Sequence, residues 1–221
     1  MKNRLIVLLL IFPFVFLSQS PTRQEAKDIA QNQIHQLKSS FLLVRLYNKK
    51  NVVEALEAKG MMKRANAVKA KQEETNKEII TSFKNFDFCE VYFFYSDNST
   101  DLIKGEYENV TLFNETGVIK ESILTGPNFF VADFGVLKNE NTRSSDESGE
   151  NKSGITKVKK YKGDKSSTKR CMFLRDSELN QLDRPFPFRV WFHPTPIQNL
   201  SYAEVVERMD EQLSEFYVKN K

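Results

Sequence analysis

The sequence predicts an α/β domain with a mixed sheet of about five to six strands, a long helical crossover after the first strand, and a C-terminal helix packed on the sheet. Short runs of aromatic and β-branched residues recur between turn residues, and a long helical segment separates the first two of them. A capped amphipathic segment closes the chain. With 8 Gly and 7 Pro among 221 residues, collagen-like and wholly disordered chains are excluded.

Residues 1–20 have the features of a secretory signal. Lys2 and Arg4 precede an uncharged apolar run of 13 residues, 5–17, which covers about 20 Å as a helix and is short for a membrane span. We therefore expect an exported protein, periplasmic or extracellular. Pro21 follows the small residue Ser20 and hinders cleavage there, so a retained N-terminal anchor stays open as an alternative. Contact with a membrane is expected only through this segment, if it is uncut.

The first half of the mature chain, which we treat as one domain over 21–221, predicts helix, strand and a broken helix. A helix starts near Thr22 and places Ala30, Ile34 and Leu37 on one face. The apolar run 41–47 carries one charge and predicts a strand, with continuation of the helix as the alternative. Residues 52–83 are helical with a break at Gly60. This crossover would make 42–46 and 91–95 parallel neighbours.

The second half predicts further short strands and one closing helix. The strands are expected at 89–95, 108–113, 128–134, 171–174 and 188–192, with the later ones antiparallel because their connections are short. Ser201 and Glu204 form a capping box that opens a helix to about residue 218. Its apolar stripe consists of Val205, Met209, Leu213 and Phe216, and we expect it to pack on the sheet.

Residues 139–169 have too few apolar groups to offset the entropy of ordering, which predicts a disordered insertion. Basic residues gather in and just after its second part. They are Lys157, Lys159, Lys160, Lys162, Lys165, Lys169 and Arg170. A solvated loop explains them, and a basic patch that touches an anionic surface is the alternative. The formal net charge of +4 does not by itself predict a nucleic-acid partner.

Candidate catalytic residues are few. Asp97 follows the strand 91–95, where open α/β sheets place their ligands, although an aspartate there is also an ordinary turn former. His193, between a strand and two prolines, is a possible acid–base group, and Cys89 its potential partner. Motifs for phosphate, dinucleotide or zinc binding do not occur in the sequence, so no cofactor and no metal are predicted.

Cys89 and Cys171 are the only cysteines of the chain. In an oxidising compartment a disulfide between them is one alternative, and two buried free thiols are the other. Both residues begin predicted strands, so a bridge requires these strands to be adjacent.

Two segments, 86–96 and 179–189, resemble a family of uncharacterised exported proteins of Bacteroidetes. The likeness also touches 42–46 and the helices after it, about a third of the chain in all. It implies a periplasmic or envelope location and transfers no catalytic residue.

Two functions follow as expectations. The first is an exported, non-enzymatic α/β domain that binds an envelope or surface partner. The second is a hydrolase or transferase of unfamiliar type with a site at the strand ends near Asp97 and His193. The second requires at least two of Asp97, Cys89 and His193 within hydrogen-bond reach in one pocket.

Overall fold

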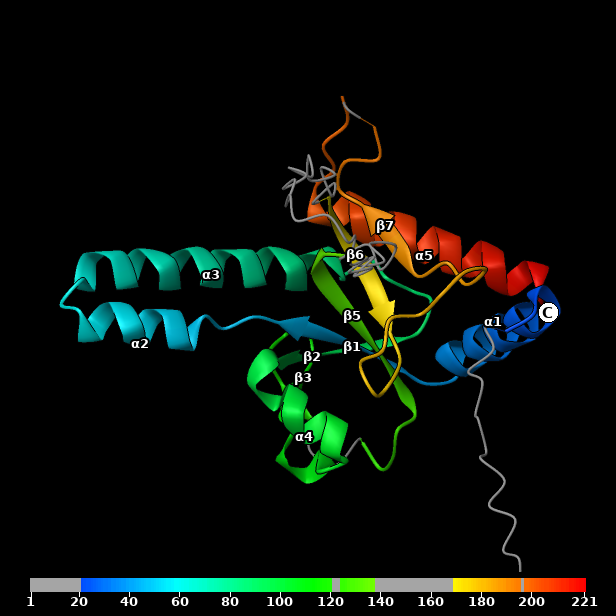
Figure 1. Cartoon of the computed structure of the whole chain (residues 1–221), viewed down its shortest axis with the longest axis horizontal. Coiled ribbons are helices and arrows are strands. Elements are labelled where there is room, and N and C mark those ends of the chain that lie inside the picture. Colours follow the sequence, from blue (N-terminus) through cyan, green and yellow to red (C-terminus); the bar gives the residue numbers. More distant parts are fainter. Residues whose placement is uncertain (1–20, 121–123, 138–168, 196) are drawn as a thin grey trace, which may run out of the picture.

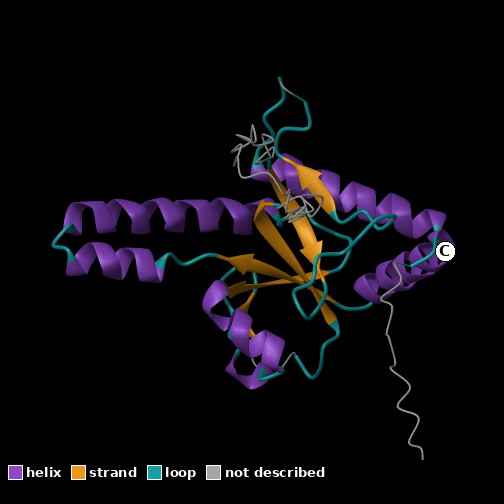
Figure 2. Cartoon of the chain, in the orientation of Figure 1, coloured by secondary structure: helices purple, strands orange, loops and turns teal. Residues whose placement is uncertain are grey.

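The computed structural model describes residues 21–120, 124–137, 169–195 and 197–221. The expected signal segment and most of the expected insertion lie outside the described residues. The predicted fold class is confirmed: one mixed sheet carries helices on both faces (Figures 1 and 2). The sheet has seven strands in the order β4-β3-β2-β1-β5-β6-β7. Within these residues, no helix combines the length and apolar character needed to cross a membrane.

The centre of the sheet is parallel. β1 (Phe41–Leu46) pairs in parallel with β2 (Glu90–Tyr95) on one side and with β5 (Phe129–Val136) on the other. The predicted pairing across the helical crossover is therefore confirmed. The expectation that the later strands are antiparallel is wrong for the β1–β5 pair, because the connection after β2 crosses over β1 to its other side.

The remaining strands are antiparallel and lie toward the edges. β6 (Arg170–Arg175) pairs with β5 and with β7 (Arg189–Trp191). On the opposite side, β3 (Leu112–Phe113) and β4 (Ile119–Lys120) are only two residues each. Of the strand expected at 108–113, only Leu112–Phe113 forms, and Tyr107–Asn109 is a 3-10 turn.

One face of the sheet carries the main core. α1 (Arg23–Lys38), the C-terminal end of α3 (Met62–Ser82) and α5 (Tyr202–Lys219) cover it with apolar side chains. The predicted stripe of α5 is confirmed, since Val205, Met209 and Leu213 are buried and the helix packs on β6 and β7. α4 (Ser99–Lys104) covers part of the other face around a smaller cluster.

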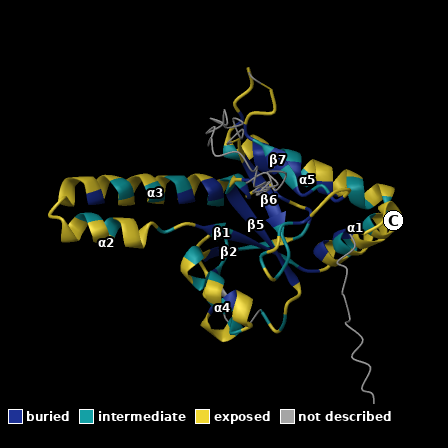
Figure 3. Ribbon diagram, viewed as in Figure 1, coloured by how far each residue is buried: buried dark blue, intermediate teal, exposed yellow. Residues whose placement is uncertain are grey.

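The helical crossover is a hairpin that extends away from the sheet (Figure 1). α2 (Lys50–Ala58) has no buried residue, and its main neighbour is α3 (Figure 3). The predicted break at Gly60 is confirmed: its φ of 70° lies in the left-handed region, where glycine is strain-free. The core of the sheet therefore does not account for α2 or for the distal half of α3.

Candidate functional site at the carboxyl edge of the sheet

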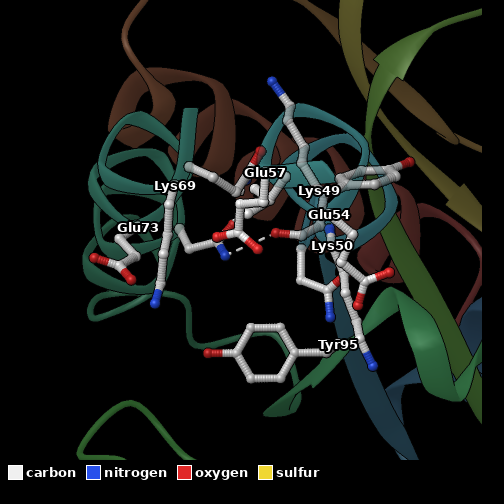
Figure 4. Close-up of a pocket in the computed structure, with 12 residues that line it drawn as sticks. Lys49, Lys50, Glu54, Glu57, Lys69, Glu73 and Tyr95 are labelled. Carbon is white, nitrogen blue, oxygen red and sulfur yellow. Dashed lines mark hydrogen bonds between the residues drawn. The ribbon is translucent and has the colours of Figure 1, made fainter. Parts of the chain in front are cut away.

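A groove lies where the carboxyl ends of β1 and β2 meet the base of the helical hairpin. Its volume is about 450 Å³, which lies in the range of small-molecule sites. Tyr47 follows β1, and Tyr95 ends β2. Figure 4 shows Tyr95 across the open groove from Glu57. The charged residues of its rim are Lys49, Lys50, Lys69, Glu54, Glu57 and Glu73. We call this feature the carboxyl-edge groove.

A buried carboxamide, that of Asn76, holds the helical hairpin against the strand end in the carboxyl-edge groove. Asn76 on α3 is buried, and its Nδ2 donates to the backbone oxygen of Tyr47 at 2.9 Å. Its Oδ1 accepts from Nε2 of Gln72 at 2.9 Å. Because both groups of the buried amide are paired, α3 is held in register with the end of β1. The hairpin base is thus positioned relative to the strand ends.

Behind the carboxyl-edge groove lies an ionic cluster centred on Asp133 of β5, whose side chain is 1% exposed. Arg45 of β1 forms an ion pair with Oδ2, and Nε of Arg175 on β6 lies 3.4 Å from the same oxygen. The hydroxyl of Tyr47 donates to Oδ1 at 2.7 Å. Three strands therefore converge on one buried carboxylate, and we call Asp133, Arg45, Arg175 and Tyr47 the Asp133 cluster.

The raised pKa of Tyr47 argues against proton transfer by this residue. Burial, and then the charge of Asp133, raise the pKa of Tyr47 to about 12. Burial alone would lower the pKa of Arg45, but the charge and hydrogen bonds of Asp133 and Tyr47 outweigh it and raise that pKa. Tyr47 consequently stays protonated throughout the ordinary pH range, and its hydroxyl donates a hydrogen bond to Asp133.

Asp97 lies where the sequence analysis placed it, just after β2, but it is exposed. Its carboxylate accepts a hydrogen bond from Nδ2 of Asn48, a residue that lines the carboxyl-edge groove. The structure thus connects Asp97 to the groove through Asn48. Through this hydrogen bond, Asp97 links the end of β2 to the end of β1.

The structure does not bring Asp97, Cys89 and His193 together. Cys89 precedes β2 and lies at its amino end, so the strand separates it from Asp97 by about 20 Å. His193 is exposed beyond the end of β7, and four strand spacings, about 19 Å, separate β7 from β2. The catalytic grouping on which the hydrolase or transferase alternative depended is not formed.

Cys89 and Cys171 are free. β2 and β6 are separated by β1 and β5, and the two cysteines lie toward opposite ends of the strands, so they are more than about 14 Å apart, beyond the reach of a disulfide. The alternative of two free thiols is the one observed. Burial raises the pKa of Cys89 to about 12 and that of Cys171 to about 11.

These pKa values predict unreactive thiols in the folded protein. At pH 8, we expect both cysteines to react with a disulfide reagent at least about a hundredfold more slowly than free cysteine, because the thiolate is the nucleophile. The rate should rise as the pH approaches 11–12. In denaturant, both thiols of each chain should react as fast as free cysteine. Rapid reaction at pH 8 without denaturant would contradict the burial of these side chains.

The lysines at positions 157–165 of the expected basic patch lie outside the described residues, and Lys169 and Arg170 lie within them. Lys169 is exposed. Arg170 is part of the fold, because its guanidinium lies over the rings of Phe192 and Tyr202 at 4.6 and 4.8 Å. Burial lowers the pKa of Arg170. Arg170 therefore joins β6 to β7 and α5 through aromatic stacking.

Sequence reasoning missed most residues of this region. The candidate residues did not include Arg45, Arg175, Tyr47, Tyr95, Asn76 or Asp133. One signal was present: Arg45 and Asp133 are single charges of opposite sign within two otherwise apolar strands. No family model matches this chain, and searches among curated proteins and solved structures find no match.

Proposed function

We propose that this chain is an exported, non-enzymatic α/β domain that binds an envelope or surface partner in the carboxyl-edge groove. The observation that carries the proposal is the composition of the groove. It combines an exposed face of Tyr95 with carboxamides and a mixed lysine and glutamate rim. Tyrosine offers a large contact area together with a polar end, which makes it a frequent interface residue.

The mixed charge of the rim suits a partner that carries both positive and negative groups. Three lysines and three glutamates surround the groove, so a polyanion would meet repulsion from as many charges as attract it. A polar segment that carries both signs, such as a stretch of polypeptide, is complementary to this rim. We therefore favour a protein segment of the envelope as the partner.

Binding is favoured over catalysis by the state of the polar groups. Among the described lining residues, Tyr47 is the only titratable residue whose side chain has a hydrogen-bond partner. Its hydroxyl donates to Asp133, and this bond is structural. The hydrolase or transferase alternative has no observation in its favour. The resemblance to exported proteins of Bacteroidetes is in keeping with an envelope location.

Site-specific crosslinking tests this proposal. A benzophenone amino acid at Tyr95 of the full chain, expressed in the native host and irradiated, should yield an adduct in the envelope or extracellular fraction. The control is the same group at Ile103, which is exposed on α4 and does not line the groove. Equal adducts from both positions, none from Tyr95, or an adduct only in the cytosol would contradict the proposal.

A further inference from the structure

The tip of the helical hairpin, residues 58–64, has a surface that the carboxyl-edge groove does not use. Met61 and Met62 are 41% and 52% exposed, and they lie at the turn between the two helices. Methionine at these exposures has no packing role in the described core. Two adjacent exposed methionines at the end of a projecting hairpin indicate a contact outside the domain.

The charge around the hairpin tip has one sign. Between Glu57 and Glu73 the sequence contains no acidic residue and five basic ones, Lys59, Lys63, Arg64, Lys69 and Lys71. The three nearest the tip are exposed and take part in none of the ion pairs formed within the described residues. Lys69 also lies on the groove rim, which carries both signs of charge, whereas the three basic residues nearest the tip do not line the groove.

We infer that the hairpin tip docks on an anionic lipid surface. Lys59, Lys63 and Arg64 would pair with phosphate headgroups, while Met61 and Met62 enter the boundary between headgroups and acyl chains. Basic residues that surround an apolar point are the composition of interfacial membrane contacts, since their aliphatic stems reach past apolar groups to the headgroups. A nucleic acid would use the same charges but leave the methionines in water.

The position of the hairpin tip supports this docking. α2 and α3 project from the sheet, so the tip can reach a flat surface before the body of the domain does (Figure 1). The absence of buried residues from α2 leaves its place in the fold unexplained by the core. Membrane contact at the tip does not depend on a partner in the carboxyl-edge groove, and either can fail without the other.

An environment-sensitive dye at the hairpin tip tests the inference in the full chain. The dye is attached through Met61→Cys, and through Ile103→Cys as the control site. With vesicles of equal parts phosphatidylglycerol and phosphatidylethanolamine, emission at 61 should shift to the blue and emission at 103 should not. Pure phosphatidylcholine vesicles should give no shift. Because the dye reports its own surroundings, binding through residues 1–20 alone does not produce this result.

Removing the basic charges of the tip tests the inference quantitatively, through the affinity for vesicles. Changing Lys59, Lys63 and Arg64 together to glutamine should weaken vesicle affinity about a hundredfold, since each basic residue near an anionic surface contributes about fivefold. The matched control, glutamine at the exposed Lys27, Lys84 and Lys104, should change it less than about twofold. Equal losses, an unresponsive dye at 61, or a response to duplex DNA in place of vesicles would overturn the inference.

Discussion

Replacing Asp133 with alanine is expected to lower the free energy of unfolding by about 3–5 kcal/mol. The substitution leaves the guanidinium groups of Arg45 and Arg175 without the carboxylate that both approach, in the interior where three strands meet. A cation that loses its buried partner retains the cost of desolvation without the compensating attraction. The hydroxyl of Tyr47 also loses its acceptor. Denaturant unfolding measures the change.

Asp97→Ala is the matched control for Asp133→Ala. Asp97 is exposed, and its one side-chain hydrogen bond is with Asn48, so we expect a loss below about 1 kcal/mol. A double-mutant cycle with Arg45→Ala should show that the two losses are not additive, because the residues share one interaction. If Asp133→Ala cost no more than Asp97→Ala, the Asp133 cluster would not stabilise the sheet.

The second large effect concerns the C-terminal helix. Leu213 is fully buried in the main core, and Leu213→Ala should lower the free energy of unfolding by about 2–5 kcal/mol. The loss combines the transfer of the missing methyl groups with the cavity left between α5 and its neighbours. The midpoint of urea unfolding should fall while the slope of the transition is unchanged.

Two variants on α5 calibrate the result for Leu213. Ser201→Ala removes the acceptor for the backbone N–H of Glu204 and should cost about 1 kcal/mol. Gln212→Ala, at an exposed position beside Leu213, should change stability by less than about 0.5 kcal/mol. A midpoint that is unchanged by Leu213→Ala would mean that the helix is not anchored on the sheet.

Elements defined by local patterns were predictable from the sequence. The capping boxes at Thr22 and Ser201, the left-handed turn at Gly60 and the apolar stripe of α5 depend on residues within one or two helical turns of each other. The apolar run of β1, the aromatic run of β2 and the long helical crossover between them predicted a parallel pair for a different reason: a crossover of this length joins parallel strands. For these elements, local sequence determines local structure.

The placement of β5 was decided only by the tertiary structure. Its sequence is equally suited to a parallel or an antiparallel neighbour, and β1 has parallel partners on both sides. That choice brings Asp133 opposite Arg45, although 88 residues separate them along the chain. Single charges in apolar strands signalled a buried ion pair, but the sequence carries no measure of which strands lie side by side.

The candidate site shows the same division. The sequence indicated the strand end at Asp97 as the place for a ligand, because the carboxyl ends of parallel strands meet at one edge. The groove beside it is built from α2, α3, Tyr47 and Tyr95, whose proximity follows from how the hairpin leaves the sheet. Strand order separates His193 from Asp97, and the length of β2 separates Cys89 from Asp97. The sequence determines the chemistry of each residue and the local pattern. Tertiary packing sets the distances between side chains that are far apart along the chain.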